Sequence, residues 1–145
     1  MPIPPLLHLQ SIEKYKKHFE SVYCRHQIMT FDSYKVRFRK SIFEHAFYES
    51  THRDKIKDMF STKRAERMDW IKYALQDPNS DIRNGYDNKR KRFTINRRVT
   101  IISGNYIVII RIKSRQLKEA EFITAYVADS QTTSQKILTS PKWEG

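Results

Sequence analysis

The chain has 145 residues, the size of one ordinary domain, and its 39% hydrophobic residues can bury a core without disulfides or metals. Its 28 lysines and arginines outnumber 16 aspartates and glutamates, and the formal charge of +12 favours polyanions such as RNA, DNA or an anionic membrane surface. Only three glycines occur, in neither a G-x-G-x-x-G nor a G-x-x-x-x-G-K-S/T pattern, which excludes dinucleotide-binding and P-loop domains.

The first part of the chain is predicted to form an arm, a helix and a hairpin. Three prolines in residues 1–10 predict an extended, loosely held arm. Apolar residues recur at helical spacing in residues 11–20, with Ser11 as the predicted N-cap. Residues 22–31 and 34–38 are rich in β-forming residues, and the Asp-Ser pair between them is typical of a turn, so a hairpin is expected.

More helices are predicted in the middle of the chain, where residues 40–77 contain neither proline nor glycine. Helical patterns cover residues 41–49, 55–60 and 62–76, and an Asp-Pro-Asn sequence ends the last of them. Residues 79–91 contain several turn-forming residues and predict a loop.

Strands are predicted in the last third of the chain. Residues 98–103, 105–113 and 120–128 are rich in β-forming residues and lack helical periodicity. Helices followed by antiparallel strands predict an α+β fold, with N-terminal helices packed on a small antiparallel sheet of about four strands. Residues 1–145 show no repeat and no break in composition, so a single domain is expected.

Several kinds of site are not expected. Cys24 is the only cysteine, which excludes an intrachain disulfide and favours a reducing compartment. The five histidines lie in unlike contexts and the carboxylates do not cluster, so neither a metal site nor a cofactor is predicted. The apolar runs are short and the first residues lack the features of a signal peptide, so a cytoplasmic protein without membrane contact is expected.

Two predicted helices carry candidate catalytic residues. His45 lies among aromatic residues, whose packing would bury it partly and bring its pKa near neutrality; the alternative is a core histidine satisfied by one hydrogen bond. Arg64 and Arg67 lie three positions apart, where two guanidiniums suit a phosphate. The alternative for this arginine pair is a solvated helix face paired with Glu66 or Asp69.

Two other groups predict contacts with nucleic acid. Phe122, Thr124 and Tyr126 share a strand face by alternation, and the two hydroxyls suit a phosphate oxygen; the alternative is an ordinary half-polar face. Basic residues near the stacking rings of Tyr86 and Phe93 are expected to hold an RNA backbone, unless they merely solubilise a loop. This basic set comprises Lys89, Arg90, Lys91, Arg92, Arg97, Arg98, Arg111 and Lys113.

Four short sequences together resemble a known family. They are His-Ala-Phe from His45, Arg-Ala-Glu-Arg-Met-Asp-Trp-Ile from Arg64, Tyr-Ile-Val-Ile-Ile from Tyr106 and Phe-Ile-Thr-Ala-Tyr from Phe122. Residues 42–143 thereby resemble the nuclease core of the BECR ribonuclease superfamily, named for Barnase, EndoU, the tRNA-cleaving colicins and RelE, and especially its phage- or toxin-associated branch. The resemblance implies helices on a four-stranded antiparallel sheet. It also implies metal-independent RNA cleavage through a 2′,3′-cyclic phosphate.

The function predicted on this basis is a metal-independent RNA endonuclease, a toxin or phage-related effector acting on tRNA or mRNA. His45 would act as general base or acid, and Arg64 and Arg67 would hold the scissile phosphate. Thr124 and Tyr126 would bind a phosphate oxygen. The resemblance further implies pairing with an antitoxin or immunity protein.

Two other functions stay open. One is a basic RNA- or DNA-binding module without catalysis, and the other is a protein of a toxin–antitoxin system that binds an acidic partner. Convergence of His45, Arg64 and Thr124 in one cleft would favour the enzyme. The oligomeric state is left open.

Overall fold

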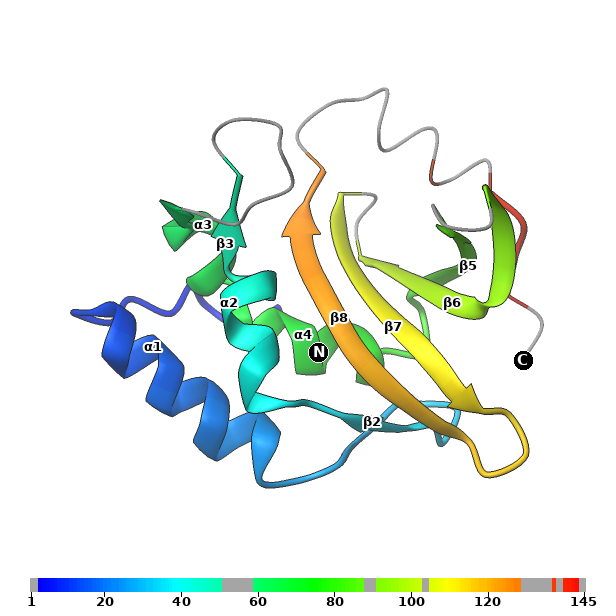
Figure 1. The fold of residues 1–145 in the computed structure, drawn as a ribbon, viewed down its shortest axis with the longest axis horizontal. Coiled ribbons are helices and arrows are strands. Elements are labelled where there is room, and N and C mark those ends of the chain that lie inside the picture. Colours follow the sequence, from blue (N-terminus) through cyan, green and yellow to red (C-terminus); the bar gives the residue numbers. More distant parts are fainter. Residues whose placement is uncertain are drawn as a thin grey trace.

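The computed structural model describes residues 3–50, 59–87, 91–102, 105–128, 137 and 140–143. Within these residues, six strands form one mixed sheet in the order β1-β2-β8-β7-β6-β5 (Figure 1). The strands are β1 (Ile28–Met29), β2 (Lys35–Arg37), β5 (Asp81–Asp87), β6 (Arg92–Ile102), β7 (Tyr106–Ser114) and β8 (Glu119–Val127). Neighbouring strands are antiparallel except for β2 and β8, which run parallel.

The helices of the described residues are short. They are α1 (Ile12–Phe19), α2 (Phe43–Ala46), α3 (Thr62–Ala65) and α4 (Met68–Gln76). Ser11 caps α1 as predicted, since its side chain accepts a hydrogen bond from the Lys14 backbone N–H at 3.2 Å. A π-helical turn extends α1 through Glu20–Cys24, and a 3₁₀ turn over Lys40–Ile42 precedes α2. A separate two-stranded sheet joins β3 (Tyr48–Glu49) to β4 (Met59–Phe60).

The prediction of N-terminal helices on about four antiparallel strands is wrong, because the sheet is larger and mixed. One added strand is β5, which lies inside the segment predicted to be a loop; its turn-forming residues include Asn84 and Gly85 at a β-bulge. The other addition is the β1–β2 pair, which joins the sheet through parallel pairing of Val36 with Ala120. The predicted helix over 62–76 is also interrupted between α3 and α4.

The main hydrophobic core lies between the helices and one face of the sheet, here called the covered face. Phe19 of α1, Phe43 of α2 and Ile71 of α4 are buried in this core together with Val36 and Phe122 of the sheet. Burying one such side chain contributes about 1.5–3 kcal/mol. This core fixes which side chains of the alternating strands are left on the opposite face.

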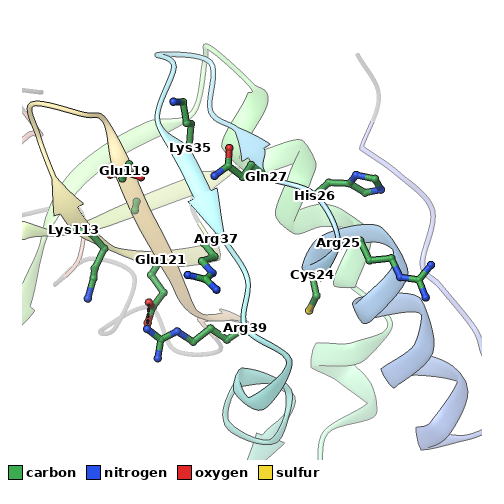
Figure 2. Close-up of a pocket in the computed structure, with 11 residues that line it drawn as sticks. Cys24, Arg25, His26, Gln27, Lys35, Arg37, Arg39, Lys113, Glu119 and Glu121 are labelled. Carbon is green, nitrogen blue, oxygen red and sulfur yellow. Dashed lines mark ion pairs between the residues drawn. The ribbon is translucent and has the colours of Figure 1, made fainter.

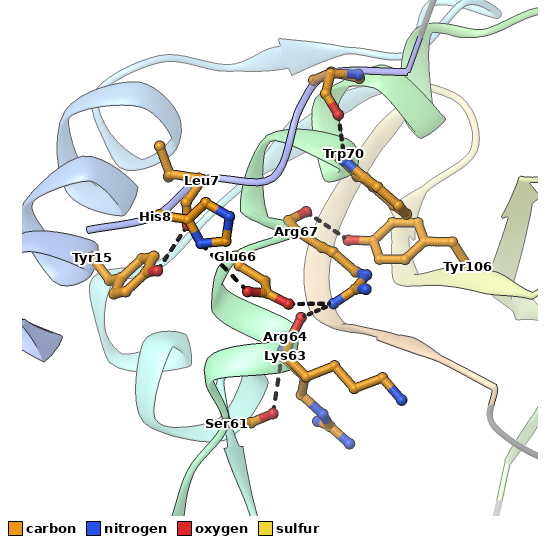
Figure 3. Close-up of polar contacts among 11 residues, drawn as sticks. Leu7, His8, Tyr15, Ser61, Lys63, Arg64, Glu66, Arg67, Trp70 and Tyr106 are labelled. Carbon is orange, nitrogen blue, oxygen red and sulfur yellow. Dashed lines mark hydrogen bonds and ion pairs between the residues drawn. The ribbon is translucent and has the colours of Figure 1, made fainter. Parts of the chain in front are cut away.

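The N-terminal arm is anchored in the part that the structure describes. Trp70 Nε1 donates to the Pro4 carbonyl at 2.7 Å, and the Leu7 N–H donates to the Glu66 carbonyl at 2.7 Å. The hydroxyl of Tyr15 donates to the Leu7 carbonyl at 2.7 Å (Figure 3). These bonds hold the arm against α1 and the α3–α4 segment, whereas the proline content alone predicted a loosely held arm.

The buried tyrosines predict a loss of stability at alkaline pH. Burial raises the pKa of Tyr106 well above its ordinary value of about 10, and burial likewise raises the pKa of Tyr23. The unfolded chain therefore loses these protons first, so the contribution of these two tyrosines to the free energy of unfolding is constant below about pH 10. Above that pH it falls by about 1.4 kcal/mol per pH unit for each such group.

Thermal unfolding followed between about pH 8 and pH 11.5 measures this effect. Tyr106→Phe removes one titrating group and is expected to flatten the decline, although it also leaves the Arg67 carbonyl without the hydroxyl that donates to it at 3.2 Å. Equal slopes for the wild type and the variant would contradict the prediction.

Candidate nucleic-acid interface

The face of the sheet opposite the covered face carries most of its strand cations. Val36, Ile112 and Ala120 are buried in the main core, so the residues beside them in β2, β7 and β8 point to the other side. Cross-strand pairing continues this side from Arg111 of β7 to Arg97 of β6. We call this surface the basic face; with Arg39, which follows β2, it comprises Lys35, Arg37, Arg39, Arg97, Arg111, Lys113, Glu119 and Glu121.

A polar hollow of about 380 Å³ lies at the β2 end of the basic face (Figure 2). Residues 24–27, which precede β1, form its rim, and side chains of β2, β7 and β8 form the rest. We call it the basic pocket. Its cations are Arg25, Lys35, Arg37, Arg39 and Lys113. Such a concentration of positive charge in a concavity attracts phosphate groups.

The carboxylates of this pocket do not neutralise its cations. Glu121 is only 8% exposed and pairs with Arg39 at 3.0 Å and Arg111 at 3.2 Å. Two arginines thus share one carboxylate. Among the described residues, Lys35, Arg37 and Lys113 make no side-chain ion pair, and all three are exposed. Their charge is available to a ligand.

Cys24 lines the basic pocket but is a poor nucleophile. Burial raises the pKa of its thiol, Glu20 raises it further, and Lys40 opposes the rise. The thiol is therefore protonated at neutral pH, which agrees with the low reactivity of buried cysteines.

The sequence prediction overlooked β2 as a source of cations. Lys35, Arg37 and Arg39 alternate with Val36 and Phe38, both of which are buried. This alternation of basic and apolar residues is the pattern of a strand with one charged face. The pattern was available in the sequence, although nothing in it showed that β2 joins β8.

The predicted nucleic-acid-binding residues separate into four groups, of which the last is Arg98 alone. Arg97, Arg111 and Lys113 lie on the basic face, and Lys91 and Arg92 are exposed where β6 begins. Lys89 and Arg90 lie outside the described residues.

Arg98 was predicted to bind nucleic acid, but its side chain is completely buried. Its cross-strand partner is the core residue Ile110, and its Nη1 donates to both carboxylate oxygens of Asp32 at 2.9 and 3.1 Å. The guanidinium also lies 5.6–5.9 Å from the ring centroids of three aromatic residues, Phe31, Tyr34 and Trp143. Burial lowers the pKa of Arg98 and Asp32 opposes that shift. Arg98 is therefore a structural residue.

Two of the predicted catalytic residues are in contact. The guanidinium carbon of Arg64 lies 5.4 Å from the centroid of the Tyr126 ring. Burial raises the pKa of Tyr126, and the charges of Arg64 and Arg97 oppose the rise. The Tyr126 hydroxyl is therefore protonated at neutral pH and can donate a hydrogen bond.

Thr124 belongs to the same part of the sheet. Thr124 and Tyr126 pair with Ile109 and Ile107 and share one face of β8, opposite the covered face, as predicted. Among the described residues the Thr124 hydroxyl has no hydrogen-bond partner, although it is buried. The prediction that Phe122 shares this face is wrong, because Phe122 lies in the main core.

Arg67 is held elsewhere, between α3 and α4 (Figure 3). Its Nη1 donates to the Lys63 carbonyl at 2.8 Å and to Glu66 at 3.0 Å, and its guanidinium lies 5.3 Å from the Trp70 ring. The Arg67 side chain is therefore bound to residues of its own helical segment. Arg67 thus pairs with Glu66, as the alternative for this arginine pair predicted, and the phosphate clamp stays a prediction.

His45 is exposed, contrary to the partial burial expected from its aromatic neighbours. Those neighbours, Phe43 and Phe47, turn into the core instead. Arg64 Nη1 donates to the carbonyl of Ala46 at 3.3 Å, so contacts run from the residue after His45 through Arg64 to Tyr126. The structure thus joins α2 to the Arg64–Tyr126 pair through the backbone.

Within the described residues, no three histidine, cysteine, aspartate or glutamate side chains group closely enough to hold a metal ion. No helix in that part of the chain combines the length and apolar composition needed to cross a membrane. No protein-family model, curated protein or solved structure matches the chain, so its function is inferred from the geometry of the basic face and the Arg64–Tyr126 pair.

Proposed function

We propose that this protein binds single-stranded RNA along the basic face, with backbone phosphates in the basic pocket. The observation that carries the proposal is the charge of this face, where six cations surround two carboxylates and one of these, Glu121, already serves two arginines. The same surface would bind an acidic protein, but the exposed rings described below favour unpaired bases.

The extent of the charged surface supports a polymer as the ligand. The cations come from β2, β7 and β6, and β8 lies between β2 and β7. At about 4.8 Å between neighbouring strands, this surface spans roughly 14 Å, which exceeds the size of one phosphate group. A ligand with several phosphates in a row matches it.

Neutralising the unpaired cations tests the proposal. Lys35→Gln, Arg37→Gln and Lys113→Gln in one protein are expected to weaken RNA binding and to flatten its salt dependence. Each lost contact changes the slope of log K against log salt by about 0.7 for a single strand, so three contacts change it by about 2. Fluorescence anisotropy with a labelled oligonucleotide at several salt concentrations measures this slope.

A matched control removes three exposed cations that lie on helices. Lys14→Gln, Lys17→Gln and Lys72→Gln change the net charge equally but leave the basic face intact. Equal slopes for the two triple variants would show that only net charge matters and would refute binding at the basic face. Preference for duplex RNA or for DNA over single-stranded RNA would refute the choice of ligand.

Cleavage of the bound RNA is a second candidate function, favoured by the contact between Arg64 and Tyr126 and by the resemblance to BECR ribonucleases. In this reaction the 2′-oxygen forms a bond to phosphorus while the bond from phosphorus to the 5′-oxygen breaks. A base takes the 2′-hydroxyl proton and an acid protonates the leaving 5′-oxygen. Arg64 would stabilise the charged phosphorane, and Tyr126 and Thr124 would donate hydrogen bonds to it.

His45 is the proposed proton-transfer group of this second candidate. Incubation with total RNA in excess EDTA, followed by end-group analysis, tests the reaction. The expected product carries a 2′,3′-cyclic phosphate. The cleavage proposal would be refuted if the RNA stayed intact after incubation, or if its cleavage required added magnesium. Either result would not affect the proposal of RNA binding, which the charge variants test separately.

A further inference from the structure

Two adjoining cavities lie beyond Arg97, where the basic face meets β5. The larger one, here called the aromatic cavity, has a volume of about 370 Å³. Its lining includes Tyr86, Phe93, Val99 and Ile137. The smaller cavity, of about 250 Å³, shares Tyr86, Val99 and Ile137 with it and adds Arg97 and Tyr126. The aromatic cavity therefore adjoins a second cavity that is lined by Arg97, a cation of the proposed RNA surface.

The rings that line the aromatic cavity are unusually exposed. Tyr86 and Phe93 are each 44% exposed, and their ring centroids lie 5.5 Å apart at an interplanar angle of 78°. In this edge-to-face arrangement, a face of one ring remains available for another flat group to stack on it. Exposed aromatic rings beside a cavity are typical of a ligand site.

Gly85 keeps Arg97 beside the aromatic cavity. A methyl group at Gly85 would lie only 2.8 Å from Cδ of Arg97 and even closer to its Cγ. The absence of a side chain lets the stem of Arg97 cross the strand at the bulge between Asn84 and Gly85. A charged group and an apolar hollow are thus held next to each other.

We propose that the aromatic cavity takes one unpaired base of the RNA strand, which stacks on Tyr86 or Phe93 while the adjoining phosphate contacts Arg97. This inference rests on the proposed function. A nucleotide has a flat, largely apolar base and a charged phosphate. The aromatic cavity matches the base, and Arg97 matches the phosphate. The volume falls within the range of roughly 300–1,000 Å³ found for small-molecule pockets. Stacking on aromatic rings accepts any base, because every base has a π-face.

An oligonucleotide lacking bases tests the proposal separately from binding at the basic face. An eight-nucleotide RNA and the same RNA with three consecutive abasic riboses are titrated by fluorescence anisotropy. Wild-type protein is expected to bind the intact RNA about 5- to 150-fold more tightly for one stacked base. Equal, salt-dependent affinities would overturn the aromatic-cavity proposal and leave RNA binding standing. Binding of neither oligonucleotide would overturn both.

Variants assign the stacking to the rings. Phe93→Leu combined with Tyr86→Leu keeps apolar bulk, so the fold is preserved, but removes both π-faces. The preference for intact RNA is expected to disappear while abasic RNA binds as before. Leu117→Ala, at a side chain that is 63% exposed in the β7–β8 turn, is the control and should keep the preference. A preference that survives in the double variant would place the base elsewhere.

Competition with a free nucleotide distinguishes a cavity that takes a base of an RNA strand from one that takes a mononucleotide. Adenosine monophosphate at the concentrations that saturate RNA binding is expected to leave the oligonucleotide bound, because it contributes one phosphate to the basic face. Tight binding of adenosine monophosphate alone would make the cavity a mononucleotide site and overturn the proposal.

Discussion

Asp32→Asn is expected to lower the free energy of unfolding by about 3 kcal/mol. The substitution preserves the shape of the side chain but removes the charge that pairs with Arg98, whose guanidinium is completely buried. Among the described residues, Arg98 Nε and Nη2 already lack hydrogen-bond partners. Removing one partner of a buried pair costs about 3–5 kcal/mol, and the lower end applies because Asp32 is 29% exposed. Urea denaturation measures the change.

Two comparisons separate charge burial from other effects. Asp81→Asn removes the charge from a more exposed pair with Arg83, at 2.8 Å, and is expected to cost at most about 1 kcal/mol. Arg98→Met removes the buried charge itself and leaves Asp32 partly in water, so it is expected to cost less than Asp32→Asn. A larger loss for Arg98→Met would show that the contacts with the three rings matter more than the ion pair.

If the protein cleaves RNA as the second candidate function requires, Arg64→Met is expected to lower the cleavage rate by about 10²–10³-fold, the usual effect of losing one group that stabilises developing charge. Arg67→Met is its matched control, because Arg67 is bound to Glu66 and the Lys63 carbonyl, whereas Arg64 lies over the Tyr126 ring. The control is expected to destabilise the protein but to keep the cleavage rate of the folded molecules. Single-turnover cleavage of a labelled RNA at saturating protein measures both rates.

The two arginine variants also test the geometry of the site. Arg64→Lys keeps the charge but loses the planar contact with the Tyr126 ring, so partial activity is expected. A reduced rate for Arg67→Met with full activity for Arg64→Met would place the phosphate beside Trp70 and refute the assignment to Tyr126.

Local patterns in the sequence predicted some elements well. The β-forming residues of the last third do form β6, β7 and β8, and Ser11 does cap α1. Both depend on neighbours in the chain, which a sequence shows directly. β5 was missed because its Asn84-Gly85 pair is typical of turns, whereas here it continues the strand opposite a bulge of β6, where the pairing shifts from Arg98 to Thr94.

The candidate site was harder to predict, because it depends on pairing between distant residues. The alternation that placed Phe122 with Thr124 fails because Ile109 pairs with Thr124 while the next residue, Ile110, pairs with Phe122. Ile123 is the extra residue, and this bulge reverses the faces of the two parts of β8. Arg97 and Arg98 are adjacent arginines that the sequence alone does not distinguish, and only the register of β6 against β7 shows that Arg98 is fully buried whereas Arg97 is half-buried on the basic face.

The parallel pairing of β2 with β8 has a consequence for synthesis of the chain. Val36 emerges from the ribosome roughly 80 residues before its partner Ala120, a wait of about 4–17 seconds at typical elongation rates. During that time the β1–β2 hairpin has no strand to pair with, and the aromatic residues of α1 and α2 lack Phe122, on which Phe38 stacks at 4.8 Å. Closing so long a loop is slow. The nascent chain therefore exposes an apolar surface to chaperones until translation of β8 is complete.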